Sequence, residues 1–99
     1  MLQIVEIVRS YTATHNPIVV VSALSAQIKT EGTTTRLLTA AQRAVEGDKY
    51  GCRMLLNAIK TTHLVAVHEA MGDCPDSSVV QNDISEDLDK LTNFMDAIM

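Results

Sequence analysis

Aromatic residues are scarce in this 99-residue chain, which has two tyrosines, one phenylalanine and no tryptophan. Hydrophobic residues still make up 46% of the sequence, so the chain can bury a core, and that core has to be aliphatic. The length is enough for one small domain and too short for two. We therefore expect a single domain packed through Val, Leu, Ile, Ala and Met side chains.

Basic residues are also in the minority, because eight Lys and Arg stand against twelve Asp and Glu, giving a net charge of −4. A protein that binds nucleic acid normally presents a basic face, so we expect no nucleic-acid partner. The acids are concentrated in residues 73–99, where seven of them accompany a single base, Lys90. We interpret this excess as the solvated face of a helix, with a docking tail as the alternative.

Cysteine motifs and long apolar runs are missing as well. Cys52 and Cys74 form no Cys-x-x-Cys motif, which favours two reduced thiols. The opening "MLQIVEIVRSY" lacks the basic-then-apolar order of a secretory signal, and no apolar run is long enough to span a membrane. His63 and His68 lie about 140° apart around a helix, so they cannot bind one metal ion from a single face. We expect a soluble, cytoplasmic protein with no membrane partner and no metal site.

Apolar residues at helical spacing predict four helices, over residues 2–14, 33–46, 51–71 and 83–98. An Asn-Pro pair after the first helix and glycines after the second and third supply stop signals. Asp83, followed three residues later by Glu86, resembles a capping box at the start of the last helix. Residues 72–82 are therefore predicted to be a loop.

One segment, "PIVVVSAL" at residues 17–24, predicts a β-strand instead. Its apolar run is continuous and rich in β-branched residues, which is typical of a strand covered on both faces in a parallel sheet. No second segment offers the backbone partner that a buried strand needs. We expect either a dimer formed through this strand or, as the preferred interpretation, a piece of a larger α/β domain, since the last helix also reaches Met99 without a stop signal.

A polar stretch, "SALSAQIKTEGTTTRLL" at residues 22–38, follows the apolar run directly. In open α/β sheets, ligands bind where strands end and loops cross into the next helix. A helix N-terminus favours an anion, so the stretch suits a phosphate or a carboxylate, although it matches no glycine-rich phosphate-binding motif. The candidate residues are Ser22, Ser25, Lys29, Gly32, Thr33, Thr34, Thr35 and Arg36. The alternative is that a threonine caps the helix while Lys29 and Arg36 are ordinary surface charges.

The same stretch resembles a motif of the aspartokinases, which are ATP-dependent aspartate kinases with the amino-acid-kinase fold. Fungal-type members carry S-A-x-S-x-x-x-K-x-E-G-T-T-x-R-L-L, and this chain follows that pattern closely from Ser22 to Leu38. Three further segments, "EIVRSY", "IKTTHLVAVHEAM" and "DLDKLTNFMDAI", resemble helices of the family. The resemblance covers essentially the whole chain.

The resemblance implies an incomplete three-layer α/β domain, mostly helical here, with about four helices and one buried strand. Residues 1–99 would form part of the N-terminal aspartate-binding lobe. The complete enzyme would use ATP and Mg²⁺ to phosphorylate the side-chain carboxylate of L-aspartate, the first step towards Lys, Thr, Met and Ile, and complete relatives are homo-oligomers. The K-F-G-G-T-S strand of the family is absent from the sequence, so the chain alone is expected to be inactive and to bind no cofactor.

The family motif also implies roles for individual residues. Ser22 would lie beside the reacting groups, and Thr35 would hydrogen-bond the aspartate. Arg36 stands where a shorter bacterial motif has asparagine, and it would either face the substrate or brace the loop. The remaining positions would support the loop: Ser25, Lys29, Gly32, Thr33 and Thr34. No catalytic residue is assigned. The alternative function is a non-enzymatic helical interaction module that dimerises or pairs through its exposed strand.

Overall fold

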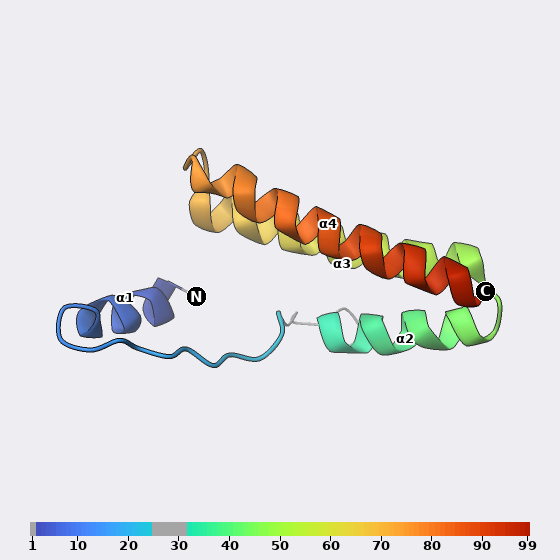
Figure 1. Cartoon of the computed structure of the whole chain (residues 1–99), viewed down its shortest axis with the longest axis horizontal. Coiled ribbons are helices and arrows are strands. Elements are labelled where there is room, and N and C mark those ends of the chain that lie inside the picture. The colour runs from blue at the N-terminus through green and yellow to red at the C-terminus, as the bar shows by residue number, and fades with distance from the viewer. Residues whose placement is uncertain (1, 25–31) are drawn as a thin grey trace.

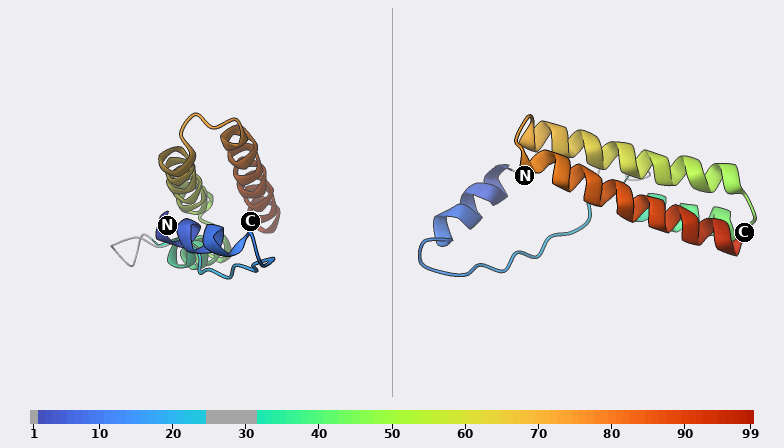
Figure 2. Two further views of the ribbon diagram at one scale, coloured as in Figure 1. Left: turned by 90° about the vertical axis from the view of Figure 1, so that its left-hand side faces the viewer. Right: turned by 45° about the horizontal axis from the view of Figure 1, so that its top comes forward.

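The computed structural model describes residues 2–24 and 32–99, and within these ranges every regular element is an α-helix. The four helices, shown in Figure 1, are α1 (Leu2–Tyr11), α2 (Thr33–Val45), α3 (Lys49–Met71) and α4 (Asp76–Ile98). Helices α3 and α4 run antiparallel along their whole length, and the shorter α2 packs beside them, mainly against α3. Helix α1 lies off one end of this three-helix bundle, at the far end of an extended stretch of chain (Figure 2).

Two glycines make the tight connections of the bundle possible. Gly47 follows α2 with φ of 78°, and Gly72 follows α3 with φ of 55°, a left-handed backbone region that residues with a Cβ rarely adopt. The chain then re-enters a helix almost at once. The carboxylate of Asp48 caps α3 by accepting a hydrogen bond from the Gly51 amide at 2.9 Å. Short glycine turns therefore force α2, α3 and α4 to lie next to one another.

The core of the bundle is small and contains no aromatic side chain. Its fully buried apolar residues are Ala40 and Ala44 of α2, Cys52, Leu56 and Ile59 of α3, and Met95 of α4. The two alanines of α2 leave little side-chain volume between the helices, so the backbone of α2 can approach α3 closely. The expectation of an aliphatic core is confirmed for the described residues.

The seam between α3 and α4 repeats like a coiled coil. Cys52, Leu56 and Ile59 on α3 are spaced by four and three residues, as are Leu88, Leu91 and Met95 on α4. This spacing keeps one apolar stripe of each helix facing the other over several turns. It explains why the two longest helices stay in contact along their length.

The predicted β-strand at residues 17–24 is wrong. The segment is extended, but it is not a strand, and the side chains of Ile18 and Val20 are each 91% exposed. A strand forms only when a neighbouring strand accepts and donates its backbone hydrogen bonds, and the described part of the chain contains no such neighbour. The three-layer α/β domain expected from the resemblance is therefore contradicted, because what the structure describes is all-helical.

Two helix boundaries also differ from the prediction. Helix α4 begins at Asp76, so most of the loop predicted over residues 72–82 is helical, and the expected capping box at Asp83 lies inside the helix. Pro75 precedes the first turn with φ of −55°, which suits a helix start. Helix α1 ends at Tyr11, and the residues up to Thr14 form a turn. None of the helices in residues 2–24 and 32–99 combines the length and apolarity that crossing a membrane would require.

Candidate functional site

The start of α2 is the part of the polar stretch that the structure describes, and it lacks a side-chain cap. Gly32 occupies the N-cap position in an extended conformation, and no threonine hydroxyl bonds to a backbone amide of the first turn. The prediction that a threonine caps this helix is therefore wrong. The first intrahelical bond runs from the Arg36 amide to the Gly32 carbonyl at 3.0 Å. The amides of Thr34 and Thr35 consequently have no acceptor within the helix.

A backbone hydrogen bond joins the end of the extended segment to the start of α2. The amide of Thr33 donates to the carbonyl of Leu24 at 3.2 Å, so the end of the extended segment lies at the start of α2. Ser22, two residues before Leu24, is exposed, and Thr35 is half-buried. The arrangement places the end of the extended segment next to the amides at the start of α2. Ser25 and Lys29 lie outside the described residues.

Arg36 connects the start of α2 to the middle of α3. Its Nη1 donates to Oγ1 of Thr62 at 2.9 Å, and the Thr62 hydroxyl in turn donates to the carbonyl of Ala58 at 2.9 Å. Both hydrogen bonds are partly buried, so water competes with them less than it would with an exposed hydrogen bond. The geometry is that of a brace between α2 and α3.

Thr62 is a contributor to this region that the sequence interpretation did not identify. It lies at helical spacing with Leu55, Ala58 and Ile59, where a hydroxyl is unusual. The signal that could have identified it is this misplaced polar group, since a half-buried hydroxyl needs a hydrogen-bond partner. In the structure its partners are the Arg36 guanidinium and the Ala58 carbonyl.

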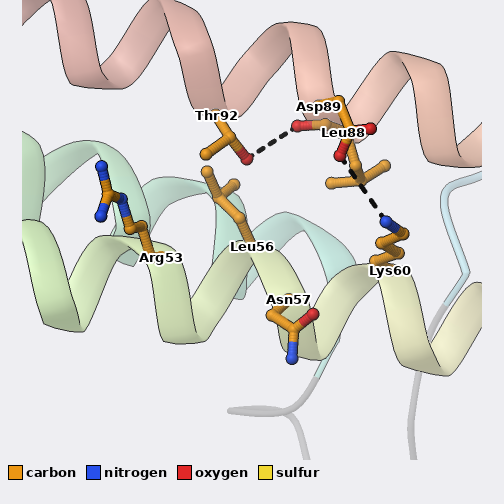
Figure 3. Close-up of a pocket in the computed structure, with 7 residues that line it drawn as sticks. All are labelled: Arg53, Leu56, Asn57, Lys60, Leu88, Asp89 and Thr92. Atoms are coloured by element: carbon orange, nitrogen blue, oxygen red, sulfur yellow. Dashed lines mark hydrogen bonds and ion pairs between the residues drawn. The ribbon is translucent and has the colours of Figure 1, made fainter.

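A second polar region lies along one flank of the α3–α4 seam, where a cavity of about 240 Å³ opens (Figure 3). Its lining consists of Arg53, Leu56, Asn57, Lys60, Leu88, Asp89 and Thr92. Lys60 Nζ lies 3.6 Å from Oδ1 of Asp89, and the Thr92 hydroxyl donates to the Leu88 carbonyl at 2.8 Å. Most polar groups in this cavity already have protein partners, so it does not resemble a prepared ligand site.

Arg53 and Asp96 form the best-aligned ion pair of the bundle. Nε of Arg53 is 3.2 Å from Oδ1 of Asp96, and Nη2 is 2.6 Å from Oδ2, so the pair is bidentate. The hydrogen bonds from Arg53 lower the pKa of the Asp96 carboxyl, and Asp96 in turn raises the pKa of Arg53. Together with the contact between Lys60 and Asp89, this pair fixes the register of α3 on α4.

The cysteines and histidines of the described residues form no metal site. No three His, Cys, Asp or Glu side chains in residues 2–24 and 32–99 come close enough to hold a metal ion together. Cys52 is buried, and burial is the main reason that its pKa is raised, with the charge of Asp96 a second cause. Cys74 is exposed. Nδ1 of His63 donates to the Ile59 carbonyl at 2.8 Å, which gives this ring a structural partner on its own helix.

Comparison with known proteins supplies one informative similarity. An aspartokinase from Candida albicans is 47% identical to this chain over 58 residues. The matched region amounts to 59% of the present chain and 10% of that protein, so the chain spans only about a tenth of its relative. No protein-family model matches the chain, and no solved structure matches it. The relative carries the name of the family that residues 22–38 resemble.

Proposed function

We propose that this chain is part of an aspartate kinase of the fungal type and contributes to the binding of L-aspartate. The complete enzyme transfers the γ-phosphoryl group of ATP to the side-chain carboxylate of aspartate in the cytoplasm. The observation that carries the proposal is the 47% identity to a named aspartokinase, together with the polar pattern from Ser22 to Leu38. Such phosphoryl transfer depends on the positioning of the substrates and on charge neutralisation.

The start of α2 is the proposed contact for the aspartate. A carboxylate is stabilised there by the helix dipole and by backbone amides that lack helical acceptors, those of Thr34 and Thr35. The hydroxyls of Ser22 and Thr35 add hydrogen-bond partners from the same region. Arg36 acts through its contact with Thr62, by holding this end of α2 in place on α3. Gly32 and Thr33 support the start of α2.

ATP and Mg²⁺ are assigned to other parts of the complete enzyme. The described residues bring together no group of acids that fits a metal ion, and the sequence contains no K-F-G-G-T-S segment. We therefore propose that the isolated 99-residue chain binds aspartate weakly and has no kinase activity. Their contribution is to fix the position of the carboxylate that becomes the phosphoryl acceptor.

Titration of the ¹⁵N-labelled chain with L-aspartate tests this assignment. We expect saturable chemical-shift changes at the amides of Thr33, Thr34 and Thr35, and at least fivefold weaker binding of L-asparagine, which lacks the second carboxylate. Thr35→Val should weaken aspartate binding by a similar factor. Thr61→Val, which removes an exposed hydroxyl from α3, is the matched control and should bind as the wild type does. Shifts that are absent, or that are equal for aspartate and asparagine, would contradict the assigned contact.

A further inference from the structure

Helix α2 has no capping side chain to hold its first turn. Gly32 occupies the N-cap position and brings neither a hydroxyl nor a carboxylate, and no side-chain hydrogen bond caps the helix. Such a turn frays easily, because its leading amides lack acceptors within the helix. Nevertheless α2 is helical from Thr33 onward, and the Arg36 amide bonds to the Gly32 carbonyl at 3.0 Å. The first turn therefore depends on contacts from outside α2.

A side-chain contact that reaches this first turn comes from α3, which lies beside α2 (Figure 1). The Arg36 guanidinium donates to Oγ1 of Thr62 at 2.9 Å, and both residues are half-buried. Among residues 2–24 and 32–99, no carboxylate forms an ion pair with Arg36, so Thr62 is the partner that fixes its side chain. Arg36 thus has its backbone in the first intrahelical bond of α2 and its side chain on the neighbouring helix.

Thr62 is well suited to receive this hydrogen bond. Its hydroxyl proton is directed to the Ala58 carbonyl at 2.9 Å, one turn earlier on α3, which leaves the lone pairs of its oxygen for Arg36. Ile59, three residues before Thr62, belongs to the buried core, so the acceptor stands on a firmly packed part of α3. Thr62 therefore offers Arg36 an acceptor of fixed position and fixed direction.

A comparison with Thr92 on α4 separates this contact from an ordinary threonine bond. The Thr92 hydroxyl also donates to the carbonyl four residues earlier, that of Leu88, at 2.8 Å, and Thr92 is half-buried as Thr62 is. In the part of the chain that the structure describes, no side chain of another helix donates to Thr92. The bond within the helix is thus common to both threonines, and the link to the start of a neighbouring helix distinguishes Thr62.

We propose that Thr62 is a positioning residue for the carboxylate site at the start of α2. Through Arg36 it takes the place of the missing cap and keeps the first turn helical. The amides of Thr34 and Thr35 are then held in the arrangement that receives a carboxylate. Thr62 itself does not touch the substrate. Its effect on ligand affinity rests on the proposed function, whereas its effect on the first turn does not.

The experiment combines amide hydrogen exchange without ligand and titration with L-aspartate, both followed by NMR of the ¹⁵N-labelled chain. In Thr62→Val, which removes the acceptor, we expect the amides of Arg36 and Leu37 to exchange about fivefold faster and aspartate to bind about fivefold more weakly. The amide of Ala44, in the buried part of α2, should exchange as in the wild type. Thr62→Ser keeps the hydroxyl and should stay close to the wild type in both measurements. Thr92→Val is the matched control, because it loses a bond of the same kind within its helix, and it should change neither.

Three results would overturn this role of Thr62. Unchanged exchange at Arg36 and Leu37 in Thr62→Val would show that the first turn needs no support from α3. Equal effects of Thr62→Val and Thr92→Val would reduce the contribution to general helix stability. In the background of Arg36→Met, which removes the donors, Thr62→Val should have no further effect, so an undiminished effect there would mean that Thr62 does not act through Arg36. A wild-type chain that binds no aspartate, with faster exchange in Thr62→Val, would contradict the proposed function and the effect on affinity while confirming that Thr62 supports the first turn.

Discussion

At the scale of single residues, the partly buried Arg36–Thr62 contact determines how the proposed aspartate site is built. A guanidinium has five donors and no acceptor, so its position depends on the acceptors around it. The Thr62 hydroxyl accepts a hydrogen bond from Arg36 and donates one to the Ala58 carbonyl, which orients the hydroxyl. One threonine on α3 thus sets the direction of a charged side chain on α2.

Substitution of Thr62 should reveal the strength of this contact. Thr62→Val keeps the shape of the side chain and removes the acceptor, so we expect a loss of about 1 kcal/mol in unfolding free energy, measured by urea denaturation. Thr62→Ser retains the hydroxyl and should lose less. If Arg36→Ala abolishes the difference between the Val and Ser variants, the loss belongs to the contact. Equal stability of Thr62→Val and the wild type would mean that Arg36 is satisfied by water.

At the scale of the elements, the antiparallel pairing of α3 and α4 depends on charge as well as on apolar spacing. The step from Arg53 to Lys60 on α3 equals the step from Asp96 back to Asp89 on α4, as antiparallel helices in constant register require. Each pair is partly exposed, so its effect on stability is modest. A shift in register would separate both ion pairs, so the pairs favour the observed alignment of α3 and α4.

The pH dependence of stability should report on the pair of Arg53 and Asp96. The folded pKa of Asp96 is lowered by its hydrogen bonds with Arg53, so the unfolded chain binds the proton more readily. This contribution is therefore present above the unfolded pKa of about 3.9 and is lost as the pH falls through the folded value. Urea midpoints measured between about pH 5 and pH 2 should decline less steeply for Asp96→Asn than for the wild type.

Asp83→Asn is a suitable control for that experiment. Asp83 is exposed on the same helix and forms no ion pair in the described residues, so its removal should leave the slope with pH almost unchanged. A parallel decline of the wild type and Asp96→Asn would show that the pair with Arg53 makes no contribution in solution.

The helices could be predicted from the sequence because their signals are local. Apolar spacing identified all four helices of the described residues, and the glycine stops near Gly47 and Gly72 were placed correctly. The strand was predicted from composition alone, yet a strand also needs a neighbour that composition does not provide. The start of α4 was predicted too late in the sequence, because Asp83 and Glu86 resemble a capping box although they lie inside the helix. The Arg36–Thr62 contact depends on tertiary packing, so no local pattern could reveal it.

At the scale of the whole molecule, stability is concentrated in the bundle. Among the described residues, every buried apolar side chain lies in α2, α3 or α4, and none lies in residues 3–24, which form an N-terminal arm. A backbone hydrogen bond from the Thr33 amide to the Leu24 carbonyl joins this arm to the bundle. Folding of the bundle should therefore need little from residues 1–31.

Removal of residues 1–31 tests this division. We expect the shortened chain to unfold cooperatively in urea, with a midpoint close to that of the monomeric full-length chain, because all core residues remain. Leu56→Ala should by contrast cost about 2–5 kcal/mol, since it opens a cavity at the centre of the core. Leu38→Ala, at a side chain that is 69% exposed, is its matched control and should change stability by less than about 0.5 kcal/mol. A shortened chain that is unfolded in buffer would show that the arm stabilises the bundle through contacts beyond the bond from Thr33 to Leu24.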